Sequence, residues 1–143
     1  MEINDANISL IVNYLQQTLS PMVNVRRPAE KYLDSLESNQ NYPTLLLRLI
    51  DKTEINQVIR MSAAVTFKNY VKRNWKCDDE SINKISENER NVVKSFIIGL
   101  MLKSDEVIQR QLSDAISIIG REDFPQKWPN LLSKCLTLCN NKT

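Results

Sequence analysis

The sequence predicts an all-α fold in which antiparallel helix pairs stack into an α-α superhelix. Apolar residues recur at intervals of three and four through most of the chain, which is the period of an amphipathic helix. The 143 residues include only two glycines, fewer than a strand-rich or Rossmann-like chain of this length needs for its turns. A weak internal repeat relates successive helix pairs, as is typical of a solenoid.

The expected elements form one domain, of about three helix pairs and part of a fourth. The pairs occupy about residues 5–37, 42–75 and 87–120, and the partial fourth lies within 125–139. We expect seven helices, at about 8–19, 24–37, 42–50, 55–75, 86–101, 105–119 and 131–138. The polar segment 76–86 is predicted to be a loop.

Capping signals predict several helix ends. Asn24 is expected to cap the second helix, and Pro28 would then lie where its missing N–H removes no intrahelical bond. Ser86 and Glu89 have the spacing of a capping box at the start of the fifth helix. Gly120 suits a left-handed cap, so we expect the sixth helix to end there.

The second helix of each pair carries related apolar residues. The matching positions are Val25, Ala29 and Leu33, then Ile59, Ala63 and Phe67, then, more loosely, Ile108, Leu112 and Ile116. The middle position is small in the first two copies, which allows neighbouring helices to approach, and Leu112 departs from this rule. One pair cannot bury its apolar faces alone, so the repeat predicts stacked pairs whose second helices lie side by side on one face.

The residues on which most catalytic and metal sites depend are missing or unsuitably spaced. The chain has no histidine, the commonest general base and zinc ligand. Its three cysteines, Cys77, Cys135 and Cys139, have no CxxC spacing, which favours a role as small hydrophobes over a metal or redox role. No glycine-rich phosphate loop appears. We therefore expect no catalytic residues, no cofactor and no metal.

Charge and hydropathy exclude some locations and partners. The net charge of +2 gives no general reason to bind nucleic acid or an anionic membrane. The acidic, polar start is unlike a signal peptide, and the longest apolar run, Phe96 to Leu102, is far too short for a membrane span. We expect a soluble, intracellular protein.

Basic residues gather at the end of the predicted helix 55–75. The cluster consists of Lys68, Lys72, Arg73 and Lys76, and an acidic segment, 77–89, follows it. Two interpretations remain open. The cations match the negative end of the helix dipole, or they form a docking face for an acidic partner surface.

Trp75 and Trp128 flank predicted loops, and Trp128 precedes a proline. An aromatic side chain beside proline can stack on a base or hold a proline-rich peptide. We favour the structural alternative, in which each tryptophan anchors a helix end to the core.

Four segments carry a resemblance to a known family: RRPAEK at 26–31, NQNYP at 39–43, VTFKNYVKRNW at 65–75 and QLSDAISIIGREDFPQKWP at 111–129. They resemble the N-terminal region of the importin-β superfamily, in particular its exportins that return importin-α to the cytoplasm. The resemblance extends to about Leu132. It implies a right-handed superhelix of HEAT repeats whose second helices line a concave face.

The resemblance also implies a function in nucleocytoplasmic transport. It implies that the first three repeats bind the GTP form of the small GTPase Ran. In the full-length receptor, importin-α would be the cargo, and the receptor would shuttle between nucleus and cytoplasm. Receptors of this family are many times longer than this chain, so we expect a truncated importin-β N-terminal-type domain.

Candidate Ran-binding residues follow from placing the second helices on the concave face. They are Lys31, Asp34, Lys68, Asn69, Lys72, Arg73, Asp114 and Ser117. In the structural alternative, some of these side chains cap loops or pair within the helix array. Asn69 in particular could satisfy a neighbouring backbone group.

Two other binding functions compete with this one. A general helical-repeat scaffold would bind other proteins and have no connection to Ran. An RNA-binding helical repeat would need a continuous basic groove, and the acidic segment 77–89 argues against it.

Overall fold

The computed structural model describes residues 1–76, 85–123, 126, 128, 129 and 131. These residues form six helices and, within this part of the chain, no strand. The helices are α1 (Asp5–Thr18), α2 (Val23–Leu36), α3 (Tyr42–Asp51), α4 (Gln57–Asn74), α5 (Glu87–Lys103) and α6 (Glu106–Asp123). The predicted seventh helix lies, except for Leu131, outside the described residues, as do all three cysteines.

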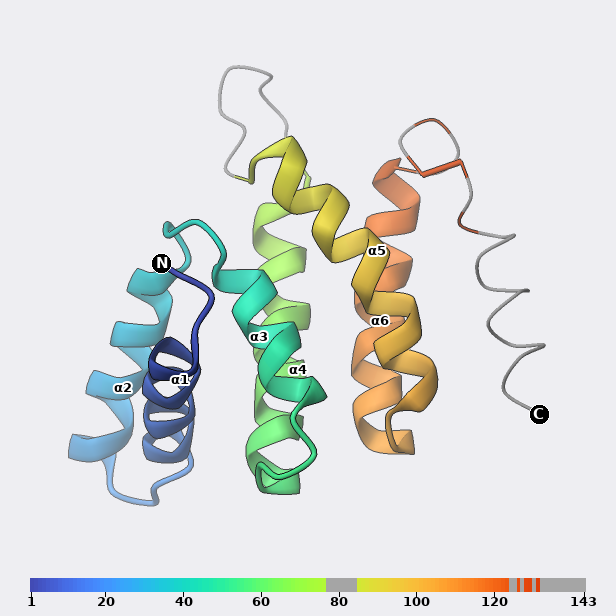
Figure 1. Cartoon of the computed structure of the whole chain (residues 1–143). Coiled ribbons are helices and arrows are strands. Elements are labelled where there is room, and N and C mark those ends of the chain that lie inside the picture. The colour runs from blue at the N-terminus through green and yellow to red at the C-terminus, as the bar shows by residue number, and fades with distance from the viewer. Residues whose placement is uncertain (77–84, 124–125, 127, 130, 132–143) are drawn as a thin grey trace.

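The six helices form three antiparallel pairs, α1 with α2, α3 with α4 and α5 with α6, that stand side by side (Figure 1). The second pair packs on the third through both of its helices, α3 on α5 and α4 on α6. The first pair packs on the second through α1, which touches α3 and α4. The predicted stack of helix pairs is confirmed, and α4 and α6 lie side by side as expected.

The helix α2 meets α4 at the C-terminal ends of the two helices. There Glu37, which follows α2, accepts hydrogen bonds from the side chains of Arg73 and Asn74, the second at 3.2 Å. Farther along, a groove lies between α2 and α4. The prediction that all three second helices lie side by side is therefore wrong for α2 and α4, which a groove separates over part of their length.

Polar side chains cap four of the described helices. The cap residues are Asn4, Asn56, Ser86 and Asp105, each accepting from backbone N–H groups of the first turn at 2.8–3.2 Å. The predicted cap at Ser86 is thus confirmed. Glu89, however, turns to α3, where its carboxylate accepts the backbone N–H of Asn41 at 3.0 Å. Asn41 has a φ of 72°, in the left-handed region that asparagine tolerates better than most residues.

The start of α2 differs from the prediction. The helix begins at Val23 rather than after Asn24, and the carbonyl of Met22 accepts the N–H of Arg26 at 2.9 Å. Pro28 therefore lies inside α2, and the carbonyl of Asn24 loses the donor that an ordinary residue would supply four positions later. The helix α2 therefore contains a proline beyond its first turn and lacks one backbone hydrogen bond there.

The end of α6 was also predicted wrongly. No glycine in the chain has a positive φ, and α6 continues through Gly120 to Asp123. A tertiary contact explains the extension, because the carboxylate of Asp123 lies 2.6 Å from the buried ammonium of Lys94 on α5. A Cβ atom at Gly120 would lie 3.4 Å from the side chain of Leu131, at the short limit of an ordinary van der Waals contact, so Gly120 lies beside that leucine within the helix instead of ending it.

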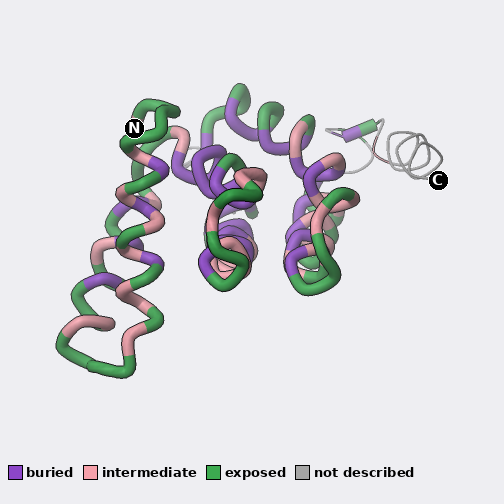
Figure 2. Tube along the Cα trace, turned by 60° about the horizontal axis from the view of Figure 1, so that its bottom comes forward, coloured by how far each residue is buried: buried purple, intermediate pink, exposed green. Residues whose placement is uncertain are grey.

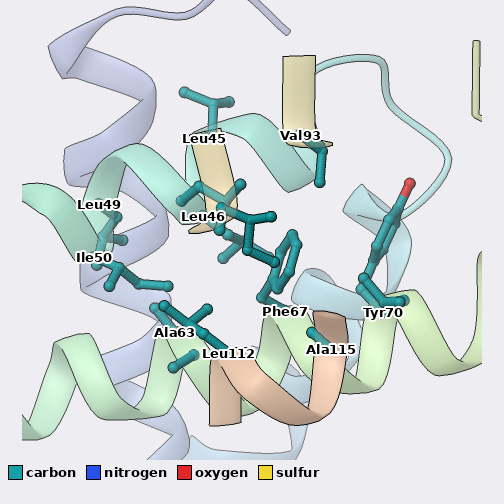
Figure 3. Close-up of a cluster of buried hydrophobic side chains, with 14 of the residues drawn as sticks. Leu45, Leu46, Leu49, Ile50, Ala63, Phe67, Tyr70, Val93, Leu112 and Ala115 are labelled. Carbon is teal, nitrogen blue, oxygen red and sulfur yellow. The ribbon is translucent and has the colours of Figure 1, made fainter. Parts of the chain in front are cut away.

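The core lies where the helix pairs face one another, and exposed residues lie on the outer sides (Figure 2). Figure 3 shows Phe67 of α4 between the side chains of α3 and those of α6. Ala63 of α4 and Leu112 of α6 are both fully buried there, so the larger residue of the third repeat still fits. Trp75 and Trp128 are 1% and 3% exposed, which supports their interpretation as core anchors.

Two negative findings apply to the described part of the chain. No helix in it has both the length and the apolar character needed to span a bilayer. Nor does it contain a cluster of three or more metal-ligating side chains.

Candidate protein-binding surface

The eight predicted site residues lie on α2, α4 and α6, and the structure divides seven of them between two grooves on either side of α4. The eighth, Lys31, is exposed on α2 and lines neither groove. The two grooves differ in size and in charge.

The larger groove, here called the basic groove, lies between the C-terminal halves of α4 and α6 and has a volume of about 500 Å³. Its lining consists of Lys68, Lys72, Lys76, Asp114, Ser117, Ile118, Arg121 and Glu122. It brings together four of the predicted residues, Lys68, Lys72, Asp114 and Ser117. Four cations against two carboxylates give it a positive excess.

The smaller groove, here called the acidic groove, lies between α2 and α4 and has a volume of about 200 Å³. Its lining consists of Thr18, Glu30, Leu33, Asp34, Thr66, Asn69 and Arg73. It contains the other three predicted residues, Asp34, Asn69 and Arg73. The alternative role for Asn69 is not observed, because its side chain makes no hydrogen bond within the described residues.

Arg73 already has a partner inside the molecule. Its guanidinium forms an ion pair and a hydrogen bond with the carboxylate of Glu37. That hydrogen bond is the main reason why the pKa of Arg73 rises further above its ordinary value. Arg73 therefore links the first helix pair to the second, a role that the sequence did not indicate because Glu37 is remote along the chain.

Several groove residues were not among the predicted site residues. In the basic groove they are Lys76, Ile118, Arg121 and Glu122, and in the acidic groove they are Thr18, Glu30, Leu33 and Thr66. Helical spacing could have added Lys76, four residues after Lys72, and Arg121, four after Ser117. Glu30 and Thr18 could not have been found in this way, because their place depends on how α1 and α2 pack against α4.

A third groove, of about 380 Å³, lies between α1 and the loop that precedes α4. Its rim includes the ion pair between Lys52 and Asp5, at 3.1 Å. None of the predicted residues lines it.

Comparison with known proteins identifies the family. Residues 29–103, more than half of the chain, match the model of the importin-beta N-terminal domain. The chain belongs to the importin-β family. Six of the eight predicted site residues lie inside the matched range, and Asp114 and Ser117 follow it.

The similarity within the importin-β family is to exportins. The chain is 61% identical over 134 residues to Exportin-2 of Oreochromis niloticus, 60% to that of Xenopus laevis and 58% to that of Homo sapiens. Each alignment covers 94% of this chain and 14% of the relative. The chain thus spans about one seventh of the length of these relatives.

A solved structure agrees with the family assignment. The chain superposes on the exportin Cse1 in its cargo-free, cytoplasmic state with a TM-score of 0.85 and 26% identity. The match covers 95% of this chain and 15% of that one. Since Cse1 is a HEAT-repeat superhelix, the predicted fold class is confirmed.

Proposed function

We propose that this chain is the Ran-binding N-terminal part of a nuclear export receptor that returns importin-α to the cytoplasm. The observation that carries the proposal is the identity of about 60% to Exportin-2 proteins along nearly the whole chain. A receptor of this kind works by binding and release, so no catalytic residue, cofactor or metal is assigned. It would shuttle between nucleus and cytoplasm.

The surface for the GTP form of Ran is proposed on the face formed by α4 with its two grooves. Grooves lined by lysines, carboxylates and an amide suit a hydrogen-bonded, charge-complementary contact with a folded protein. Importin-α is proposed as cargo of the full-length receptor, in which this chain would be one of several contact regions.

Binding to Ran tests the first part of the proposal. The purified 143-residue chain is immobilised, and Ran is applied either with a non-hydrolysable GTP analogue or with GDP. We expect concentration-dependent binding of the GTP-analogue form and much weaker binding of the GDP form. Equal binding of both forms, or of neither, would favour a general protein-binding scaffold without a connection to Ran.

A chimera tests the cargo. The 134 residues of this chain that align with Exportin-2 of Xenopus laevis, at 60% identity, replace the matching segment of the full-length receptor. The chimera should form a complex with importin-α only when Ran carries the GTP analogue. Loss of the complex in a chimera that is folded by circular dichroism would contradict the proposed role in export of importin-α.

A further inference from the structure

The connection between α1 and α2 contains the only serine or threonine of the chain that is followed by proline, Ser20 before Pro21. Ser20 belongs to neither helix. Its neighbours Leu19, Pro21 and Met22 are exposed. A residue before proline favours an extended backbone. An exposed, extended serine followed by proline is the kind of substrate that proline-directed serine kinases take.

The start of α2 has no negative group to balance the helix dipole. No side chain caps the helix at Met22, and its first turn contains no acidic residue. Arg26 and Arg27 instead place two cations near this positive end, where cations are unfavourable. The N–H groups of Val23 and Asn24 donate to no acceptor among the described residues. The donors and the positive charge at this helix start both suit an anion.

The hydroxyl of Ser20 already points to the start of α2. Its oxygen accepts the backbone N–H of Met22 at 3.2 Å. The guanidinium of Arg26 reaches back to the same loop, where it donates to the carbonyl of Ser20 at 3.5 Å. Its other contact is a partly exposed pair with Glu30 at 3.8 Å. A phosphate on the Ser20 oxygen would therefore lie within reach of backbone N–H groups and of a guanidinium, the two donors that bind phosphate best.

A kinase must open the chain locally around the serine, and the first turn of α2 is weakly held. Pro28 has no N–H, so the carbonyl of Asn24 lacks its helical partner. Met22 and Val23 are 56% and 45% exposed and bury little apolar surface. Segments with few buried contacts and few backbone hydrogen bonds open long before the whole chain unfolds.

We propose that Ser20 is a phosphorylation site for a proline-directed serine kinase and that its phosphate caps α2. In the transfer, the Oγ of Ser20 attacks the γ-phosphorus of ATP. The new bond joins this oxygen to phosphorus, the bond from phosphorus to the β,γ-bridging oxygen breaks, ADP leaves, and the hydroxyl proton passes to the carboxylate base of the kinase. The phosphate then accepts hydrogen bonds from the first N–H groups of α2 and from Arg26, which orders the first turn.

Phosphorylation of the folded chain tests the site. The 143-residue chain is incubated with an active mitogen-activated protein kinase, Mg²⁺ and ATP, and its peptides are mapped by mass spectrometry. We expect one phosphate, on Ser20, and none in the variants Ser20→Ala and Pro21→Ala. Ser38 is the internal control, because it is exposed in the next connection but is not followed by proline. A synthetic peptide of residues 14–26 serves as the substrate outside the fold.

The capping role is tested with phosphoserine incorporated at position 20, followed by urea denaturation. We expect the equilibrium constant for unfolding to fall about fivefold relative to the unmodified chain, a usual effect of a charge that matches a helix start. The effect should be smaller in the Arg26→Gln background. Phosphoserine at position 38 is the matched control. Ser38 follows the other end of α2, beside Glu37, so the same charge there should not stabilise the chain.

The site does not depend on the binding of Ran, so its failure leaves the proposed function untouched. If Ser20 of the folded chain stays unmodified, the site is wrong, whether or not the kinase accepts the peptide. If phosphate at position 20 stabilises the chain no more than phosphate at position 38, the capping of α2 is wrong. An equal effect with and without the Arg26→Gln change would show that the guanidinium does not bind the phosphate, contrary to its assigned role.

Discussion

At the scale of single residues, four charged side chains are almost completely buried near the start of α5. Glu89, Arg90, Lys94 and Asp123 are each no more than 7% exposed. The guanidinium of Arg90 lies 4.7 Å from the ring centre of Trp75 and donates to the carbonyl of the same residue at 3.0 Å. Since buried charges are costly unless they are paired or hydrogen-bonded, Arg90 on Trp75 and Lys94 on Asp123 connect α5 to the end of α4 and to α6.

Glu89 yields a prediction about pH. Burial raises its pKa, although the N–H of Asn41 opposes the shift. The folded chain therefore holds this proton more tightly than the unfolded chain. The contribution of Glu89 to the free energy of unfolding is largest below its unfolded pKa and declines as the pH rises through the folded pKa.

The variant Glu89→Gln keeps an acceptor for Asn41 and removes the buried charge. In urea denaturation we expect it to be more stable than the parent near pH 7 and equal to it near pH 3, where glutamate is protonated. Glu87→Gln is the matched control, because Glu87 is exposed in the same turn. Glu87→Gln should lower the free energy of unfolding by up to about 1 kcal/mol near pH 7, since a negative charge stabilises a helix N-terminus. A parent more stable than Glu89→Gln near pH 7 would contradict the prediction.

At the scale of helices, both glycines lie inside elements rather than at their ends. Gly99 is in α5 and Gly120 in α6. A Cβ atom at Gly99 would meet no atom within 4 Å, whereas one at Gly120 would lie 3.4 Å from Leu131. The two positions therefore share the entropic cost of glycine in a helix but differ in the space around them.

Replacing each glycine by alanine separates helix propensity from packing. Gly99→Ala should raise the free energy of unfolding by about 1 kcal/mol, because alanine restricts the unfolded chain and finds open space in the folded one. Gly120→Ala should raise the free energy of unfolding by less, because the new methyl group would have barely enough room beside the side chain of Leu131. Thermal and urea denaturation of the two variants provide the measurement, and a larger gain at Gly120 would be the contrary result.

At the scale of the whole molecule, stability comes from the contacts between helix pairs. A single pair leaves one apolar face uncovered, and stacking covers it. The helices α3, α4 and α6 meet around Phe67, which is fully buried (Figure 3). Phe67 is therefore a central part of the contact between the second and third pairs, to which α3 and α5 also contribute.

Truncating Phe67 tests this cohesion. Phe67→Ala should lower the free energy of unfolding by about 3–5 kcal/mol, the usual cost of emptying a well-packed aromatic site. The same change at Phe96, which is only partly buried on α5, should cost distinctly less. Urea denaturation followed by circular dichroism measures both. If the two variants lose equal free energy of unfolding, Phe67 stabilises the chain no more than a partly buried phenylalanine does, and the prediction is wrong.

The sequence by itself determined the helices and their pairing, because the spacing of apolar residues and the cap at Ser86 are encoded within a few neighbouring positions. It also indicated seven of the fifteen residues that line the basic and acidic grooves, among them Lys68 and Lys72, which belong to one stripe of a helix. Only the tertiary structure showed where contacts between helices outweigh a local signal for a helix end. Gly120 does not end α6, because Lys94 holds Asp123 one turn farther on. Only the tertiary structure, too, joined Arg73 to Glu37 and separated the predicted residues into two grooves, since these partners come from different helices whose contacts no local pattern records.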